Sequence, residues 1–393
     1  MTMKVELKAF SHGLLNMFKA EAKTNNPSEL IQEALLLSGW YAGICYMPNN
    51  FEDIINEPRE KTVARVNNVL KSGHHSVFEH INLTFMLEGI PKILAMVLNN
   101  EGLYSTSEKS ARYTKMVASP EEMILYDKWL EIFSEIISKK NPSLKEAHIK
   151  KLAQENARYL ISVFTPTTMA HTINLRQLNY LMYMMENFIK NSEPTPFNNR
   201  MVEVFKEFVK ELEPYKVQDL IPEGKNRNLS LFGAERQKEE EFGENYCTTY
   251  YGSFAQLAQA HRHRTLKYEM FMLKDPVFFI PPILEDESLI KMWLHDIRSV
   301  AKNFPQGTML RITERGTLED FVLKCRERLC GHAQLEIMNQ SLYTLFKYYN
   351  ITGNKYVKRY LSDYRNKAKC AFPYGTCKHP CTFGPKNSLT RLI

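Results

Sequence analysis

The sequence predicts an α/β (α+β) protein built from two tandem units, each a small mixed or antiparallel sheet covered by helices. Strand-like and helical segments occur in both halves of the chain, and a polar, charged stretch at 213–241 separates them. The length of 393 residues is typical of two domains. We therefore expect a first unit at 1–215, a linker at 216–242 and a second unit at 243–393.

The first half is expected to hold one strand among several helices. Residues 81–87 (INLTFML) alternate in hydrophobicity and are rich in β-formers, which predicts a strand. Apolar residues at helical spacing predict helices over 28–43, 62–71, 91–98, 120–140, 144–164, 178–189 and 201–212.

The second half repeats this order. Residues 248–251 predict a short β-strand, residues 253–260 a helix, and Pro276, Pro281 and Pro282 a loop. Further helices are expected over 289–302, 318–330 and 333–348.

Composition narrows the class of protein. Hydrophobic residues make up 44% and charged residues 24%, as in ordinary globular proteins. No apolar run is long enough for a membrane span and the N-terminus lacks a signal-peptide pattern, so we expect a cytoplasmic protein. The net charge of +7 suits an anionic small substrate or a polyanion. Seven irregularly spaced cysteines do not resemble a secreted disulfide framework.

Two motifs concentrate polar chemistry. His74 to His80 (HHSVFEH) holds three imidazoles and a carboxylate, which indicates either a functional site or a surface turn. Its spacing is not that of a helical zinc-protease motif. Gln259 to Arg264 (QAHRHR) gathers donors for phosphate, carboxylate or a nucleobase carbonyl, although a solvated basic helix end would look the same. Without aromatic interleaving or a broad basic stripe, it does not predict nucleic-acid binding.

Three weaker patterns accompany them. Ser105 to Tyr113 sets hydroxyls beside an arginine and could cradle an anion. Arg158, Asn174 and Arg176, and later Arg328 with the segment 333–337 (AQLEI), could be binding residues or plain helix faces. In the tail, Cys370, Cys377 and Cys381, among Gly, Pro and His379, resemble a metal knuckle and could hold a structural zinc. The spacing matches no common zinc pattern, and Cys325 or Cys330 would need to come near.

Taken together, these segments resemble the flavin-dependent thymidylate synthase family. That family carries His-x-x-x-x-Glu-His, then Arg-His-Arg-x-x-Ser-x-x-x-x-Ser-x-Arg, then Asn-x-Arg-Ser-Leu, and finally Arg followed by Ala-Gln-x-Glu-Ile. The first half keeps the His element, Ser110, Arg112, Arg158 and the Asn174-x-Arg176 pair. Its Arg-His-Arg positions hold residues 100–102 (NEG) instead.

The second half shows the converse. It keeps Gln259, the Arg262-His263-Arg264 triplet, Arg328 and Ala-Gln-x-Glu-Ile. Lys267, Met272 and Lys274 occupy the serine and arginine positions, and residues 314–316 (ERG) replace Asn-x-Arg. Because each half lacks what the other keeps, we expect one composite site made from both.

The resemblance implies a role for each matching residue. The nucleotide dUMP would be bound by Gln259, Arg262, Glu108, Ser110, Arg112, Arg158 and Arg328. FAD would be bound by His74, Arg262, His263, Arg264, Asn174 and Arg176. Catalysis would fall to Arg328, Arg262 and His263, with Arg328 polarising the uracil.

The implied reaction is the reductive methylation of dUMP to dTMP. Methylene-tetrahydrofolate would supply the carbon, and NADPH would reduce the FAD. Two alternatives stay open: a diverged flavin-dependent methyltransferase acting on another pyrimidine nucleotide, and a non-catalytic nucleotide- or RNA-binding relative. Family members are homotetramers, so we expect a homodimer of fused chains that forms a pseudo-tetramer.

Overall fold

The fold is described from a computed structural model of the chain. It covers all residues except 1, 12–25, 113, 115, 221–227, 234–237, 378–380, 382–387, 390 and 392–393. The chain forms two compact units, and each is interrupted in sequence. Unit 1 comprises residues 1–95, 101–109 and 167–229, and unit 2 comprises residues 96–100, 110–166 and 230–393. The tandem boundaries near 216 and 242 stay a prediction.

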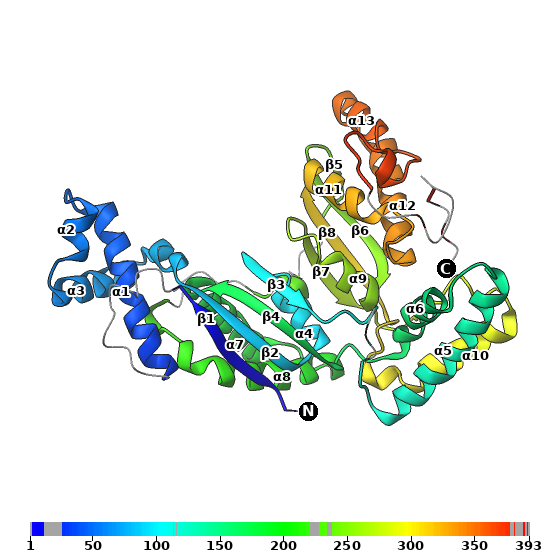
Figure 1. Cartoon of the computed structure of the whole chain (residues 1–393), viewed down its shortest axis with the longest axis horizontal. Coiled ribbons are helices and arrows are strands. Elements are labelled where there is room, and N and C mark those ends of the chain that lie inside the picture. Colours follow the sequence, from blue (N-terminus) through cyan, green and yellow to red (C-terminus); the bar gives the residue numbers. More distant parts are fainter. Residues whose placement is uncertain are drawn as a thin grey trace. The chain divides into compact units, whose positions relative to one another are not determined.

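Unit 1 is built on a four-stranded sheet in the order β1-β2-β4-β3 (Figure 1). Its strands are β1 (Lys4–Phe10), β2 (Asn82–Pro91), β3 (Tyr104–Glu108) and β4 (Pro166–Asn174). Strand β1 pairs antiparallel with β2, and β3 pairs antiparallel with β4. Buried residues alternate along β4, so one of its faces packs against the core.

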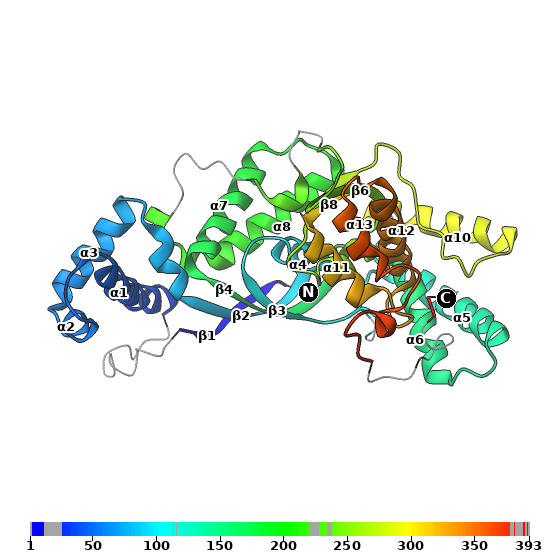
Figure 2. The same ribbon diagram turned by 90° about the horizontal axis from the view of Figure 1, so that it is seen from above.

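Helices accompany this sheet. They are α1 (Pro27–Tyr46), α2 (Phe51–Ile55), α3 (Arg59–Lys71), α7 (Leu175–Asn191) and α8 (Pro196–Leu212). The first three gather at one end of the unit in both views (Figure 1 and Figure 2), where Leu37 and Trp40 of α1 pack on Ile54 of α2. Helix α4 (Lys92–Leu98) follows β2 directly and carries the chain out of unit 1.

Unit 2 is built on a second four-stranded sheet, in the order β5-β6-β8-β7. Its strands are β5 (Glu241–Phe242), β6 (Asn245–Ser253), β7 (Lys267–Met272) and β8 (Met309–Thr317), all paired antiparallel. In both sheets the first strand is followed by the second, the fourth and then the third. Helix α9 (Phe254–Ala260) follows β6 as α4 follows β2, and α11 (Leu318–Arg328) follows β8 as α7 follows β4.

Three helices inserted between strands pack together in unit 2. They are α5 (Pro120–Lys140), α6 (Glu146–Ala157) and α10 (Glu287–Ser299). Trp129 of α5 meets Trp293 of α10 edge to face, with ring centroids 5.0 Å apart. Asp296 of α10 accepts hydrogen bonds from Trp129 Nε1 at 2.7 Å and Lys128 Nζ at 2.6 Å. These two bonds join α5 to α10 beside the apolar contact. Helices α12 (Leu335–Ile351) and α13 (Lys355–Ser362) complete the unit.

The expectation of two small antiparallel sheets covered by helices is confirmed. The expected helix over 144–164 is wrong at its end, because α6 stops at Ala157. Its last predicted residues form a short 3-10 turn, followed by an isolated antiparallel β-bridge from Ser162 to Pro305 and a further turn. Gln306 N donates to Ile161 O at 2.8 Å, and Val163 N donates to Phe304 O at 2.9 Å. These backbone contacts replace the helical hydrogen bonds.

None of the helices in the described part of the chain combines the length and the hydropathy that a membrane crossing needs.

Candidate functional site

Unit 2 gathers three arginines around one buried carboxylate at the end of α6. Glu155 Oε2 accepts from Arg112 Nε, and Glu155 Oε1 accepts from Arg391 Nη2, both at 2.5 Å. Burial alone would raise the pKa of Glu155, but Arg391, Arg112 and Arg158 outweigh it and lower the pKa. The carboxylate therefore stays ionised.

Arg158 is the least satisfied member of this group. It is 4% exposed, and its Nε and Nη2 atoms are buried with no hydrogen-bond partner among the described residues. Burial lowers the pKa of this guanidinium, but arginine still stays protonated at neutral pH. A buried charged donor without an acceptor is costly, so the position suits an anionic ligand.

A second buried carboxylate fixes the residue next to Arg158. Glu336, at the start of α12, accepts from the Tyr159 hydroxyl at 2.9 Å and from Ser253 N and Oγ at 2.8 and 2.6 Å. Burial raises the pKa of Glu336 in spite of these donors. The network ties the turn after α6 to the beginnings of α9 and α12, and so holds Arg158 in place.

The turn after α9 carries the Arg-His-Arg triplet. His263 points inward and is 5% exposed, whereas Arg262 and Arg264 on either side are exposed. Arg328 Nε donates to His263 Nε2 at 2.7 Å, and Arg328 Nη2 donates to the backbone oxygen of Gln259 at 3.0 Å. Burial and the adjacent Arg328 lower the pKa of His263 to about 2. His263 is therefore a neutral imidazole that accepts at Nε2 and carries its proton on Nδ1.

Contacts within unit 2 connect these two groups of residues. Arg112 Nη2 donates to the backbone oxygen of His332, in the loop between α11 and α12, at 3.0 Å. Burial lowers the pKa of Arg328 to about 10, and the positive charges of Arg112 and Arg262 act in the same direction. Arg112 is therefore close enough to Arg328 for its charge to affect the pKa of Arg328, although the two residues are far apart in the sequence.

The serine loop is divided between the units. Ser110 Oγ accepts from Arg112 N at 3.3 Å, and Ser110 O accepts from Thr114 N at 3.0 Å, which forms the turn that carries Arg112. Glu108 belongs to unit 1, where its carboxylate pairs with Lys92.

The remaining predicted residues lie in unit 1. Arg176 Nη1 donates to Glu79 Oε1 at 2.5 Å, which joins the His-x-x-x-x-Glu-His element to the Asn-x-Arg pair. The Arg176 guanidinium also lies over the Tyr180 ring, 5.1 Å from its centroid. Asn174 caps α7 by accepting from Gln177 N at 2.8 Å. His74 is exposed and bonds to the Tyr46 hydroxyl through Nδ1 at 3.0 Å.

In the second half, the residue at the end of β8 that corresponds to Asn174 is Thr317, which caps α11 as Asn174 caps α7, so the expected replacement by residues 314–316 is wrong in register. Glu314 lies inside β8. Glu314 is fully buried and accepts from Lys324 Nζ at 2.6 Å. The hydroxyls of Tyr246 and Tyr250 donate to the same carboxylate at 3.1 and 2.8 Å. With its oxygens used in this way, Glu314 has a structural role rather than a ligand-binding one.

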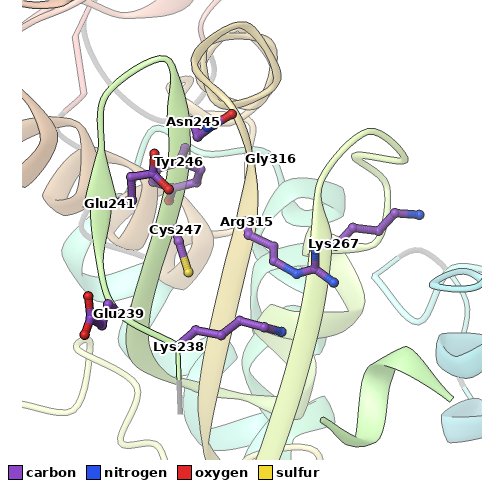
Figure 3. A pocket seen from close by; sticks show the side chains of 9 residues that line it. All are labelled: Lys238, Glu239, Glu241, Asn245, Tyr246, Cys247, Lys267, Arg315 and Gly316. Atoms are coloured by element: carbon purple, nitrogen blue, oxygen red, sulfur yellow. The ribbon is translucent and has the colours of Figure 1, made fainter. Parts of the chain in front are cut away.

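A cavity of about 700 Å³ opens on sheet β5-β6-β8-β7 (Figure 3), at a place that the sequence did not indicate. Cys247, Arg315 and Lys267 lie in register across its three main strands. Its cations are largely compensated, because Glu269 pairs with Lys238 and lies 3.6 Å from Arg315. Burial raises the pKa of the Cys247 thiol, so the cavity contains no activated nucleophile.

The expected zinc site gains no support. Among the residues that the structure describes, no three His, Cys, Asp or Glu side chains are grouped to hold a metal. Cys377 and Cys381 are exposed, and His379 lies outside the described residues.

Sequence reasoning missed Glu155 and Arg391. Glu155, in the last turn of α6, precedes the C-cap residue Arg158 by three positions, a spacing that places both side chains on one side but is common on helix surfaces. Arg391 stands alone near the end of the chain, and no pattern around it points to the site.

Part of the chain matches known proteins. Residues 29–209, less than half of the chain, match the family model described as thymidylate synthase complementing protein. Flavin-dependent thymidylate synthases from Pyrococcus furiosus and Pyrococcus abyssi are each 30% identical over 169 residues. These alignments cover 40% of this chain and 65% of each relative, so the chain spans less than two thirds of the relatives' length. The enzyme from Clostridium tetani is 27% identical over 39% of this chain and 68% of its own.

Solved structures match at lower identity. The flavin-dependent thymidylate synthase from Helicobacter pylori, complexed with FAD and dUMP, is 16% identical with a TM-score of 0.32, over 56% of this chain and 100% of that one. The UMP/dUMP methylase PolB from Streptomyces cacaoi, bound with 5-Br dUMP, is 16% identical with a TM-score of 0.31, over 52% of this chain and 87% of that one. The family match at 29–209 ends before Gln259, so the assignments from Gln259 to Arg328 depend on the motifs and the geometry.

Proposed function

We propose that the chain is a flavin-dependent thymidylate synthase-like enzyme that methylates dUMP at a site composed from both halves. The observation that carries the proposal is Arg158, a buried guanidinium with two unpaired donors and Arg112 beside the same carboxylate. Gln259, His263 and Arg328 belong to the same unit as this pair. The family match over residues 29–209 supports the proposal from the sequence side.

Phosphate would be bound by Arg112 and Arg158, with the Ser110 turn supplying the hydroxyl. Gln259, Arg262 and Arg328 would contact the rest of the nucleotide, and Glu108 stays a predicted dUMP ligand. Because His263 accepts from Arg328 Nε and the Gln259 carbonyl accepts from Nη2, the guanidinium is fixed in orientation. Fixed in this way, it can polarise a uracil carbonyl without first reorganising. His263 then acts as a positioning residue rather than a proton donor.

The flavin would be held by His74, Asn174, Arg176, Arg262, His263 and Arg264. The donor set fits FAD, because Arg262 and Arg264 are exposed on either side of His263 and suit a pyrophosphate. The chemistry supplied by bound FAD would be hydride transfer from NADPH, with methylene-tetrahydrofolate as the one-carbon donor.

The repeated strand order supports a tandem origin for the two sheets. At the end of β8, Thr317 and Glu319 stand where Asn174 and Arg176 stand at the end of β4, which supports the loss of one set of flavin ligands. The proposed assembly is a homodimer in which each chain takes the place of two subunits, which makes a pseudo-tetramer.

A spectrum and a product assay test this function. The purified chain should show flavin absorbance near stoichiometry and form dTMP from dUMP with methylene-tetrahydrofolate and NADPH. Arg158→Ala should weaken dUMP binding roughly 10- to 100-fold, the value of a charge-assisted hydrogen bond. Arg359→Ala, at an exposed arginine of α13, is the matched control and should bind as the unmodified chain does.

The outcome also separates the alternatives. Product from UMP or dCMP, with none from dUMP, would assign another pyrimidine nucleotide as the acceptor. A colourless protein that forms no product would overturn the enzyme assignment and favour a nucleotide- or RNA-binding relative.

A further inference from the structure

The positive charge of this chain is concentrated in residues 355–393. This stretch contains nine lysines and arginines and a single acidic residue, Asp363, whereas the charges of the remaining residues sum to nearly zero. From Tyr364 onward the sequence holds no aspartate or glutamate, so nothing later in the stretch offsets its basic residues. An asymmetry of this kind is typical of a chain that contacts a polyanion.

Helix α13 presents the first of these charges to solvent. The helix packs against α12 (Figure 1), and its apolar residues Val357 and Leu361 are buried. Its basic residues Lys355, Lys358 and Arg359 are all exposed. At helical spacing, Lys355 and Arg359 lie one turn apart on the same face. The outer side of α13 is therefore a short basic stripe on the surface of unit 2.

Tyrosine rings accompany this stripe. Tyr356 is 71% exposed and Tyr360 is 37% exposed, and the two lie one turn apart on α13. The Lys355 ammonium lies 5.2 Å from the centroid of the Tyr356 ring, which sets a cation beside a ring on which a base can stack. Cations that contact phosphates and rings that stack on bases are the two elements by which proteins bind single-stranded nucleic acid.

The packing of α13 excludes the membrane-surface mode of binding. A helix that lies on a membrane inserts an apolar face among the lipids. The apolar face of α13 is already used inside unit 2, because Val357 is 1% and Leu361 is 0% exposed. A duplex also fits poorly, since its bases stack on one another and leave few ring faces open to a tyrosine.

We propose that the exposed face of α13 is a binding surface for single-stranded nucleic acid. Lys355, Lys358 and Arg359 contact the phosphates of the strand. Its bases stack on Tyr356 and Tyr360, a contact that every base can make, so binding is largely independent of base sequence. This surface uses none of the residues assigned to dUMP or FAD, and it goes beyond the proposed function.

Fluorescence anisotropy of the full-length chain tests the proposal, with a labelled single strand of mixed-sequence DNA, about 15 nucleotides long, as the probe. Lys355→Ala/Arg359→Ala should bind the strand roughly tenfold more weakly, and its affinity should fall less steeply with salt concentration. Lys150→Ala/Lys302→Ala removes the same charge from exposed positions on α6 and just after α10. This control should bind as the unmodified chain does.

A second pair of variants separates stacking from charge. Tyr356→Phe keeps the ring and should bind as the unmodified chain does, whereas Tyr356→Leu should bind roughly fivefold or more weakly, the effect of losing one stacked base. Tyr251→Leu, at a tyrosine of β6 that is 66% exposed, is the matched control and should have no effect. A melting curve of each variant confirms that it is folded.

Four results would overturn the proposal. They are a failure of the unmodified chain to bind the strand, equal affinity of the two double variants, equal affinity of Tyr356→Leu and Tyr356→Phe, and tighter binding of a duplex or of phosphatidylserine vesicles than of the strand.

The result is separable from the proposed function. Calorimetry should give Lys355→Ala/Arg359→Ala the dUMP affinity of the unmodified chain, whether or not the chain forms dTMP. A loss of dUMP affinity in this variant would place α13 in the nucleotide site instead, and the proposed surface would be wrong.

Discussion

At the scale of single residues, the His263–Arg328 pair joins the two parts of the second-half motif. The imidazole can accept the Arg328 Nε proton only while it is neutral, because both nitrogens of a protonated histidine are donors. Its burial at 5% exposure removes the solvent that would favour the charged form. Protonation would therefore break the contact that orients Arg328.

This pair predicts how stability depends on pH. The pKa of His263 is about 2 in the folded chain and near the ordinary histidine value of 6.5 in the unfolded chain. Below 6.5 the unfolded state binds the extra proton, so stability falls as the pH falls. The loss approaches about 1.4 kcal/mol per pH unit, or about 2 kcal/mol at about pH 5.

Urea unfolding of the unmodified chain and of His263→Gln, each at about pH 7 and about pH 5, measures the effect. The variant cannot titrate at this position, so it should lose about 2 kcal/mol less than the unmodified chain over this interval. Parallel losses in the two proteins would contradict the assignment of a neutral, buried His263.

At the scale of elements, the packing of α5, α6 and α10 positions the turn that carries Arg158. Trp293 of α10 is fully buried and donates from Nε1 to Phe279 O at 2.8 Å. The next aromatic contact, Tyr159 on Phe279 with ring centroids 4.6 Å apart, leads directly to the residue beside Arg158. The helices inserted between strands therefore support the site through aromatic packing.

Trp293→Ala should destabilise the chain by about 3–5 kcal/mol, since a large buried ring is replaced by a cavity. Met292→Ala, at the preceding and 38% exposed position of the same helix, should stay within about 0.5 kcal/mol of the unmodified chain. Chemical denaturation of the two variants gives the comparison. If Trp293→Ala lowered the free energy of unfolding no more than Met292→Ala does, the packing of Trp293 would not contribute to stability.

The sequence predicted the helices of this fold better than its strands. Long helices such as α5 and α7 were predicted within a few residues, because their apolar faces repeat at the helical period. Only β2 and part of β6 were predicted as strands, and β1, β3, β4, β5, β7 and β8 were missed. In β4 and β8, threonine and charged residues interrupt the apolar pattern. The motifs indicated Arg112, Arg158 and Arg328, but Arg391 comes from a segment with no periodic or motif signal, and only tertiary structure places it near Glu155.

At the scale of the whole molecule, the geometry of unit 2 bears on whether a site forms within one chain. Arg158 lies beside Glu155 and Arg112, and Arg112 is near enough to Arg328 to lower its pKa. These residues belong to one compact unit of a single chain. The chain therefore needs no second copy to bring Arg112 and Arg158 into one unit with the Arg-His-Arg turn.

This arrangement predicts the behaviour of mixed dimers. Arg158→Ala and Arg328→Ala chains, co-expressed with different affinity tags and purified through both tags, should form no dTMP, because every chain carries one defect in its own site. Mixed dimers of Arg158→Ala with the unmodified chain are the control and should keep the activity of the intact chain. Recovery of activity in the doubly defective dimer would mean that Arg158 of one chain acts with Arg328 of the other. In that case the site would lie between chains, and fusion would have joined the two halves without bringing their ligands into one chain's site.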